Sequence, residues 1–298
     1  MLYRIRKFQR ALHNIACRGI VNTPPVKIKP APLTFCSMVS TTDFVMYLAA
    51  MKSMYKHMGE GRVVTVDDGS LTQEQRALLR KHLDADVRHI NDSPKRRVPK
   101  GGTWERLTTI VELSRDSYVI QVDSDTLTRN AIPEILDSYR RGRPFILAGD
   151  RRGGRLTSVE QASETARADG HPHIQTTAES KLDTIPGIKP RYVRGCSGFF
   201  GVPKGAVTLE DVEEFSEAMT AALGARWSEW GTEQMTVNYL VANLPGVGVL
   251  QPPKYTQYFG KQLCAESSFV HFIGSYRFDG FAYTRETRKL ISELRAAA

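Results

Sequence analysis

Short apolar runs alternate with helical patterns between residues 33 and 122, and this alternation limits the fold more than any other feature of the sequence. The apolar runs at 33–39, 62–66, 86–90 and 118–122 have the length of buried strands. Helical patterns lie between them at 43–58, 72–82 and 100–114, with Asp43 as an expected N-cap. Strands and helices in alternation are typical of a parallel sheet flanked by helices, so the sequence predicts an α/β fold.

The second half of the chain continues this pattern after a polar segment. Residues 149–190 contain few large apolar side chains, which favours a long excursion with helices rather than sheet. A strand pattern at 194–202, helices at 208–223 and 233–241 and a strand at 269–272 follow. We expect one domain over 33–298, preceded by a separate arm and Pro-rich linker over 1–32. No apolar stretch approaches the roughly 20 residues of a membrane span.

The positive charge of the chain is concentrated in the N-terminal arm. The net charge is +9, and residues 1–42 contain seven Lys and Arg and no acidic residue. The rest is nearly neutral, which argues against a nucleic-acid binder, because such proteins spread basic surface over the fold. Residues 1–20 show the spacing of a basic amphipathic helix, with apolar positions Leu2, Ile5, Phe8, Leu12 and Ile15. Three interpretations of this helix are open: it contacts an anionic membrane, it is a surface helix packed on its own domain, or, less favoured, it is a transit peptide.

Cysteine usage bears on the compartment. The four cysteines form no C-x-x-C pair, and no secretory signal precedes them. This favours a reducing compartment over a disulfide scaffold. We therefore expect a cytoplasmic protein. The basic arm suggests that it could lie peripherally at the inner face of the membrane.

The strongest chemical signal is a pair of carboxylates at the end of a predicted strand. Asp123-Ser124-Asp125 directly follows the apolar run 118–122, and Asp67 and Asp68 follow the run 62–66. Open α/β sheets bind ligands beyond the carboxyl ends of their strands. Carboxylates at i and i+2 in such a loop can hold a hard divalent cation that bridges phosphate oxygens. The alternative for each segment is an ordinary turn, with an N-cap Asp in the first and an Asp-Gly turn in the second.

Five segments together resemble the GT-A class of nucleotide-sugar glycosyltransferases. Residues 63–70 resemble the nucleotide-binding strand and turn of the inverting family that includes cellulose synthase, and 123–125 the metal-binding D-x-D. Residues 196–200, 233–238 and 271–277 are similar to the N-S-G, D-Q-D-x-x-N and H-F-x-G-x-x-K segments of the retaining family that includes glycogenin and bacterial lipopolysaccharide glucosyltransferases. Cys196, Met235 and Arg277 depart from those patterns, so the stereochemical outcome stays open.

The resemblance implies a GT-A (Rossmann-like) domain with a mixed, mainly parallel sheet. It implies transfer of a sugar from a nucleotide diphosphate donor, UDP-linked, to a hydroxyl of a glycan, a lipid-linked or a small-molecule acceptor. Asp123, Asp125 and His271 would hold Mn²⁺ or Mg²⁺, and Arg277 would support the departing diphosphate. The expected donor-binding residues are Asp67 or Asp68, Ser124, and on position alone Lys100 and Trp104. Glu233 is the expected catalytic carboxylate, with Glu229 as its competitor.

Each of these residues has a plainer interpretation, and two other functions compete. His271 can be a hydrogen-bonded structural residue, Arg277 a surface cation and Glu233 a first-turn helix residue. A sugar nucleotidyltransferase has the same fold, but it needs a Gly-rich basic loop after the first strand, and residues 37–43 contain neither Gly nor a basic residue. A non-catalytic nucleotide-binding scaffold would not need an intact set of metal ligands.

Overall fold

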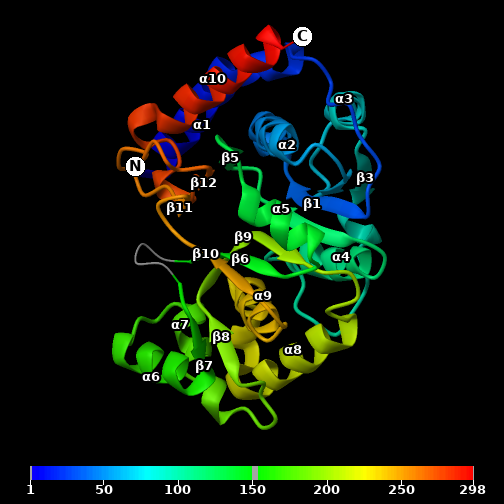
Figure 1. Cartoon of the computed structure of the whole chain (residues 1–298). Coiled ribbons are helices and arrows are strands. Elements are labelled where there is room, and N and C mark those ends of the chain that lie inside the picture. The colour runs from blue at the N-terminus through cyan, green and yellow to red at the C-terminus, as the bar shows by residue number, and fades with distance from the viewer. Residues whose placement is uncertain (1, 150–153, 298) are drawn as a thin grey trace. The chain divides into compact units, whose positions relative to one another are not determined.

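The computed structural model describes residues 2–149 and 154–297, which fall into two compact units (Figure 1). Unit 1 comprises Met1–Ile90, Val122–Leu136 and Pro252–Ala298. Unit 2 comprises Asn91–Gln121 and Asp137–Gln251. The residues of the expected N-terminal arm therefore belong to unit 1, together with the C-terminal segment.

A seven-stranded sheet is the framework of the fold, with strand order β10-β6-β9-β4-β1-β2-β3. Its strands are β1 (Leu33–Val39), β2 (Arg62–Asp67), β3 (Asp86–His89), β4 (Tyr118–Val122), β6 (Phe145–Ala148), β9 (Gly195–Val202) and β10 (Gly248–Leu250). β1 and β2, β2 and β3, and β10 and β6 pair in parallel, whereas β6 and β9 are antiparallel. This mixed, mainly parallel sheet confirms the predicted α/β class.

Unit 1 surrounds its strands with four helices and a small second sheet. The helices are α1 (Leu2–Cys17), α2 (Phe44–Met58), α3 (Gln73–Leu83) and α10 (Ala282–Ala296). The second sheet has the order β11-β12-β5, formed by Tyr255–Gln257, Phe269–His271 and Thr126–Thr128. α2 buries its Met and Tyr stripe and ends at Gly59, whose φ of 79° suits a residue without Cβ. α3 begins at Thr72, which forms a capping box with Gln75.

Unit 2 contains most of the remaining helices. These are α4 (Trp104–Ser114), α6 (Val159–Asp169), α7 (Ile174–Glu179), α8 (Leu209–Leu223) and α9 (Thr232–Ala242), while α5 (Pro133–Arg140) begins in unit 1 and ends in unit 2. Short 3-10 turns lie at Arg18–Asn22, Thr41–Asp43, Ile90–Asp92, Leu182–Thr184, Gly224–Ser228, Gly274–Tyr276 and Asp279–Phe281. Among the described residues, no helix has the length and apolar character needed to cross a bilayer.

The polar excursion contains the expected helices α6 and α7, but the expectation that it lacks sheet is wrong. β7 (Leu156–Ser158) pairs antiparallel with β8 (Arg191–Val193). Three residues are too few to show an alternating hydrophobic pattern, and Leu156 is exposed on this small sheet. The short strand leads directly into α6, because Ser158 forms a capping box with Gln161.

Candidate active site and metal centre

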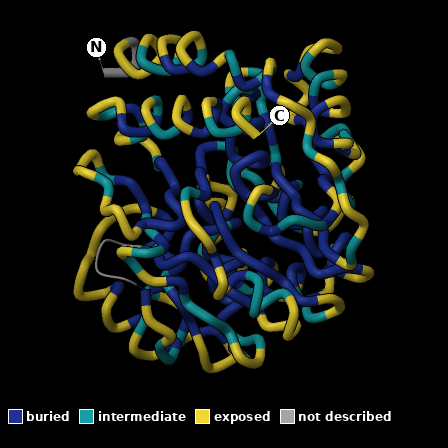
Figure 2. The backbone as a smooth tube through the Cα atoms, turned by 45° about the horizontal axis from the view of Figure 1, so that its top comes forward, coloured by how far each residue is buried: buried dark blue, intermediate teal, exposed yellow. Residues whose placement is uncertain are grey.

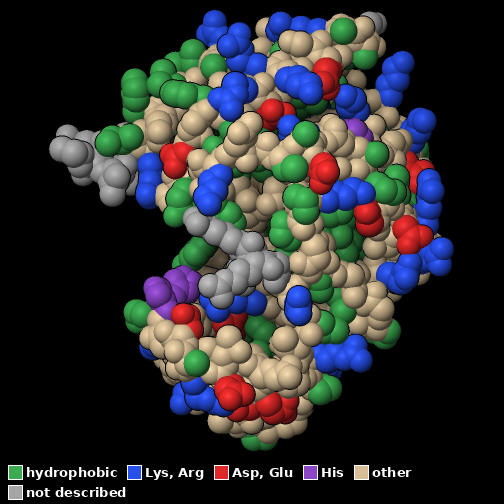
Figure 3. Space-filling model, turned by 60° about the vertical axis from the view of Figure 1, so that its left-hand side comes forward, with side chains coloured by type: hydrophobic (Ala, Val, Ile, Leu, Met, Phe, Trp, Pro, Cys, Tyr) green, Lys and Arg blue, Asp and Glu red, His purple; other side chains and the backbone are tan. Residues whose placement is uncertain are grey.

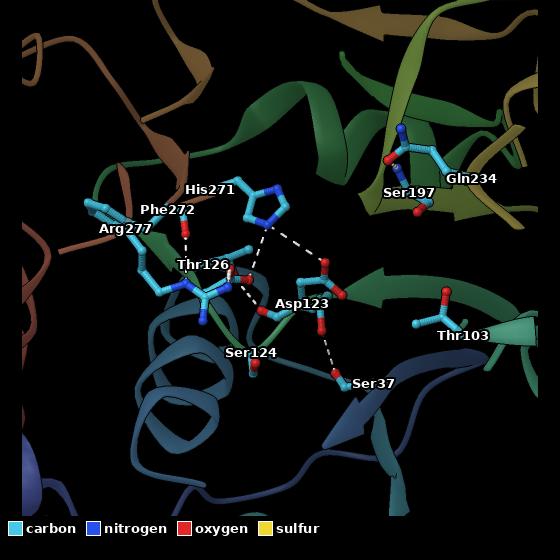
Figure 4. A network of polar contacts seen from close by, with 12 residues as sticks. Ser37, Thr103, Asp123, Ser124, Thr126, Ser197, Gln234, His271, Phe272 and Arg277 are labelled. Atoms are coloured by element: carbon cyan, nitrogen blue, oxygen red, sulfur yellow. Dashed lines mark hydrogen bonds and ion pairs between the residues drawn. The ribbon is translucent and has the colours of Figure 1, made fainter. Parts of the chain in front are cut away.

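The segment after β4 and the end of β12 bring three potential metal ligands together in unit 1. β12 pairs antiparallel with β5, and this register sets His271 opposite Thr126. The backbone N–H of Phe272 donates to the carbonyl of Asp125 at 2.8 Å, which joins the two segments. Figure 4 shows the His271 ring directed toward the carboxylate of Asp123. Residues 146 positions apart in the sequence, Asp125 and His271, therefore become neighbours.

The geometry of this cluster suits a divalent cation. His271 Nε2 lies 3.1 Å from Asp125 Oδ1 and 3.6 Å from Asp123 Oδ2. One ligand atom from each residue lies within 4.8 Å of the others. Asp125 and His271 are buried, whereas Asp123 is partly exposed. Two carboxylates and one imidazole form a donor set that fits Mn²⁺ or Mg²⁺.

Arg277 holds the Asp125 carboxylate in its ionised form. Its guanidinium forms an ion pair with Asp125 Oδ2, and its Nε donates to the carbonyl of Phe272 at 3.0 Å. Burial alone would raise the pKa of Asp125, but the charges of Arg277 and His271 outweigh it and lower that pKa below its usual range. A metal ligand must be deprotonated, and an ionised Asp125 meets this requirement. Arginine at this position supplies a planar fork that can bond the carboxylate and a carbonyl together.

Backbone contacts from other elements of unit 1 fix the Asp-x-Asp loop. Thr126 Oγ1 donates to the carbonyl of Asp123 at 2.8 Å. The Tyr283 hydroxyl of α10 donates to the carbonyl of Ser124 at 3.3 Å. Ser37 of β1 donates to the carbonyl of Val122 at 2.6 Å. The loop and the strand end before it are thus held by three hydrogen bonds, and Figure 4 shows the Asp123 side chain directed toward His271.

The two acidic residues after β2 occupy different environments. Asp67 is buried, accepts from the backbone N–H groups of Gly69 and Leu71, and forms an ion pair with Arg76 at 2.5 Å. It therefore stabilises the turn itself. Asp68 is exposed and accepts from the backbone and hydroxyl of Ser70. Of the expected pair, only Asp68 presents its carboxylate at the surface.

A second polar cluster in unit 2 is built around Glu233 in the first turn of α9. Its Oε1 lies 3.0 Å from a guanidinium nitrogen of Arg106, and both side chains are buried. Its Oε2 accepts hydrogen bonds from Ser197 at 3.1 Å and Thr103 at 3.0 Å. The backbone N–H of Ser197 also donates to Gln234 Oε1 at 3.4 Å, and Figure 4 shows these two side by side. The segments 196–200 and 233–238 are therefore brought together.

Arg106 is the main residue of this cluster that the sequence analysis did not single out. It lies on α4 at helical spacing with Ile110 and Leu113, both of which are buried. A charged side chain on an otherwise apolar helix stripe indicates a buried ion pair, because an unpaired buried charge is costly. That pattern was visible in the sequence.

The remaining expected site residues of unit 2 differ in exposure. Glu229 is about half exposed and forms an ion pair with Arg226 at 2.7 Å, which lowers its pKa. Lys100 is exposed. Trp104 is buried, donates its indole N–H to Thr232 at 3.1 Å and packs edge-on against Trp227. Its ring has little surface left for a ligand, so its contacts here are packing contacts, and the expected nucleotide contact stays a prediction.

Comparison with known proteins identifies the fold. No family model matches the sequence, and no curated relative matches it. The bifunctional glycosyltransferase WbbM superposes with a TM-score of 0.53 at 14% identity over 87% of this chain, which spans 49% of the WbbM chain. An active-site Gln-to-Glu mutant of LgtC superposes with a TM-score of 0.51 at 10% identity, covering 87% of this chain and 95% of LgtC. The chain has the GT-A fold, as the resemblance in its sequence implied.

Proposed function

We propose that the protein is a divalent-metal-dependent glycosyltransferase that moves a sugar from a nucleotide diphosphate donor, UDP-linked, to a hydroxyl acceptor. The cluster of Asp123, Asp125 and His271 in a GT-A fold is the observation that carries this proposal. The acceptor class is a glycan, a lipid-linked sugar or a small molecule, as in polysaccharide or glycolipid synthesis. The cytoplasmic location expected from the cysteines stays a prediction.

The three ligands would hold Mn²⁺ or Mg²⁺, which when bound neutralises charge on the donor diphosphate. Asp125 contributes an oxygen that is ionised and oriented by Arg277. His271 contributes an imidazole nitrogen beside both carboxylates. Arg277 adds a positive charge to the same cluster, which favours a leaving group that becomes more negative as the glycosidic bond breaks. For the nucleotide portion of the donor, we assign the Asp68 carboxylate to hydroxyl groups, and Ser124 and Lys100 as further contacts.

Glu233 and Glu229 differ in the chemistry they suit. Glu233 already accepts from Arg106, Ser197 and Thr103, so its charge is fixed and stabilised. A carboxylate held in this way is better suited to binding sugar hydroxyls or stabilising positive charge than to accepting a proton. Glu229 is exposed and pairs with Arg226, and it is the candidate base if the reaction inverts. The anomeric configuration of the product, observed by NMR, decides between the two outcomes.

The test uses Asp123→Asn, because Asp123 is partly exposed and its replacement leaves the Asp125–Arg277 ion pair intact. With wild-type protein, Mn²⁺ and UDP-sugars should raise the melting temperature together more than either does alone. We expect Asp123→Asn to abolish that joint shift and metal-dependent donor hydrolysis while its melting temperature without ligands stays near wild type. Asp137→Asn, which makes the same change at a partly exposed carboxylate of α5 outside the metal cluster, is the matched control and should keep the metal response.

Three results would contradict the proposal. A joint shift that survives Asp123→Asn would remove the metal assignment. Donor binding without hydrolysis or transfer, across a panel of acceptors, would favour the non-catalytic scaffold. Pyrophosphate release from a nucleoside triphosphate and a sugar phosphate would favour the nucleotidyltransferase.

A further inference from the structure

The N-terminal helix α1 packs along the C-terminal helix α10 in unit 1, and Figure 2 shows the two side by side. The contact is made by the polar side of α1. His13 stacks on Tyr283 with ring centroids 4.4 Å apart, and its Nδ1 lies 3.0 Å from the hydroxyl of Thr284. Cys17 is also buried against this helix, 3.9 Å from the carbonyl of Thr284. The two interpretations of residues 1–20, a packed helix and a membrane-binding one, are therefore compatible.

The apolar stripe of α1 faces solvent. Its side chains are exposed to 47% at Ile5, 63% at Phe8, 40% at Leu12 and 65% at Ile15, and Phe281 beside the start of α10 is exposed to 58%. These are five of the eight exposed large hydrophobic side chains among the described residues. Scattered exposed apolar residues need no explanation, but four of them at helical spacing along one helix mark an interaction surface.

Both of these packed helices also carry exposed basic side chains. Exposed cations are Arg6, Lys7 and Arg18 in and after α1, and Arg285, Arg288 and Lys289 on α10. Figure 3 shows hydrophobic and basic side chains adjoining at the upper left of the molecule. α1 contains no acidic residue. On α10, Glu286 pairs with Arg129 and Glu293 with Lys56 at 2.8 Å each, and Glu293 also lies 4.0 Å from Lys289. The combined surface, here called the α1/α10 face, therefore exposes both apolar and positive side chains.

We propose that unit 1 docks on an anionic lipid bilayer through the α1/α10 face. An apolar helix stripe bordered by Lys and Arg is the arrangement with which helices lie in the interface of a membrane. Anionic headgroups complement the exposed cations, and the apolar side chains enter the boundary between headgroups and acyl chains. The contribution of α10 could not be seen from residues 1–20 alone. The proposal holds whatever reaction the protein catalyses.

The test is co-sedimentation of the full chain with vesicles of phosphatidylcholine alone and of phosphatidylcholine and phosphatidylglycerol in equal parts. Deleting residues 1–20 is unsuitable, because it removes the buried His13, Cys17 and Ile20 from the fold. The apolar variant is Phe8→Ser with Ile15→Ser, and the charge variant is Arg285→Ser with Lys289→Ser. Leu156→Ser and Lys204→Ser, which change exposed residues of unit 2, are the matched controls.

We expect wild type and both controls to bind the anionic vesicles, with binding that weakens at high salt. The apolar variant should lose at least about tenfold in partition coefficient. The charge variant should lose roughly fivefold for each cation removed. Unchanged circular dichroism and melting temperature would show that the variants are folded, and donor turnover with a soluble acceptor should be unaffected.

Equal binding to both kinds of vesicle, absence of binding, or wild-type binding by the apolar variant would overturn the proposal. Light scattering after size-exclusion chromatography tests the alternative that a second copy of the chain binds this face. A wild-type dimer that the apolar variant dissociates would assign the face to a second copy of the chain and would also overturn it. Because vesicle binding needs no donor, failure here is distinguishable from failure of the glycosyltransferase assignment.

Discussion

Replacing Glu233 with Gln should destabilise the protein substantially, because the change removes one half of a buried ion pair. Glu233 and Arg106 lie 3.0 Å apart, with side chains only 2% and 5% exposed. The amide keeps the shape of the carboxylate and can still accept from Ser197 or Thr103. It cannot neutralise the guanidinium of Arg106, so the buried positive charge loses this partner.

The expected loss in the free energy of unfolding is about 3 kcal/mol, from the range of about 3–5 kcal/mol for breaking a buried pair. The lower end applies because Arg106 keeps a hydrogen bond to the Ser197 hydroxyl at 3.3 Å. A domain with a stability of roughly 5–15 kcal/mol still folds after such a loss. Adding Arg106→Met to Glu233→Gln should recover most of it, since a buried pair replaced by apolar side chains is often tolerated.

Urea denaturation of the wild type, both single variants and the double variant measures these values as a double-mutant cycle. Glu229→Gln is the matched control. It removes the same charge from an exposed ion pair with Arg226, so it should change the stability little. A loss of stability in Glu233→Gln no larger than in this control would show that Glu233 and Arg106 do not form a charged pair in the native state.

Two further perturbations test other parts of the fold. Burial, with a smaller contribution from Arg277, lowers the pKa of His13 from 6.5 to about 4. As pH falls, the unfolded chain therefore binds the proton first, and the free energy of unfolding drops between those pH values by up to about 1.4 kcal/mol per pH unit. His13→Asn should flatten that part of the profile of urea midpoint against pH. A profile of wild-type slope in folded His13→Asn would show that His13 does not titrate in this way. Gly195→Ala would press a methyl group into the Ile146 side chain and should lower the free energy of unfolding by about 1–3 kcal/mol, measured by thermal or urea unfolding. In Gly248→Ala the added methyl group has ordinary contact distances, so the loss should be distinctly smaller. Equal losses in the two variants would contradict this packing difference.

The central strands and long helices were predictable because each has its own periodic signal. The strand expected at 33–39 is β1 with the same bounds, and the helix expected at 208–223 is α8 with Thr208 as its N-cap. Strands of three residues, such as β5 and β10, are defined by their partners and have no period to detect. α10 is a different case: it was not among the expected helices, although its buried Tyr283, Thr287 and Leu290 have helical spacing in the sequence.

The candidate site was predictable where its residues belong to compact segments. Asp123 and Asp125 stand two apart after a strand, and His271 stands in a segment of its own that resembles a known pattern. The ion pair between Asp125 and Arg277 was not predictable, because it depends on how the turn after β12 folds back toward β5. The assignment of Asp67 to the turn and of Asp68 to the surface likewise follows from three-dimensional contacts with Arg76 and Ser70.

The polar excursion shows most clearly what spacing along the sequence cannot reveal. Gln234 donates to Gln175 at 3.0 Å across 59 positions, and Gln175 in turn donates to the buried Glu179 at 3.2 Å. The Tyr192 hydroxyl lies 2.7 Å from Glu179 and 3.0 Å from the sulfur of Met235, the position where the resembled pattern has an aspartate. Burial raises the pKa of Glu179 although nearby Arg194 opposes the shift. Within unit 2, the Tyr192 hydroxyl thus connects the Glu179 carboxylate of the excursion to Met235, where the resembled pattern has its second aspartate.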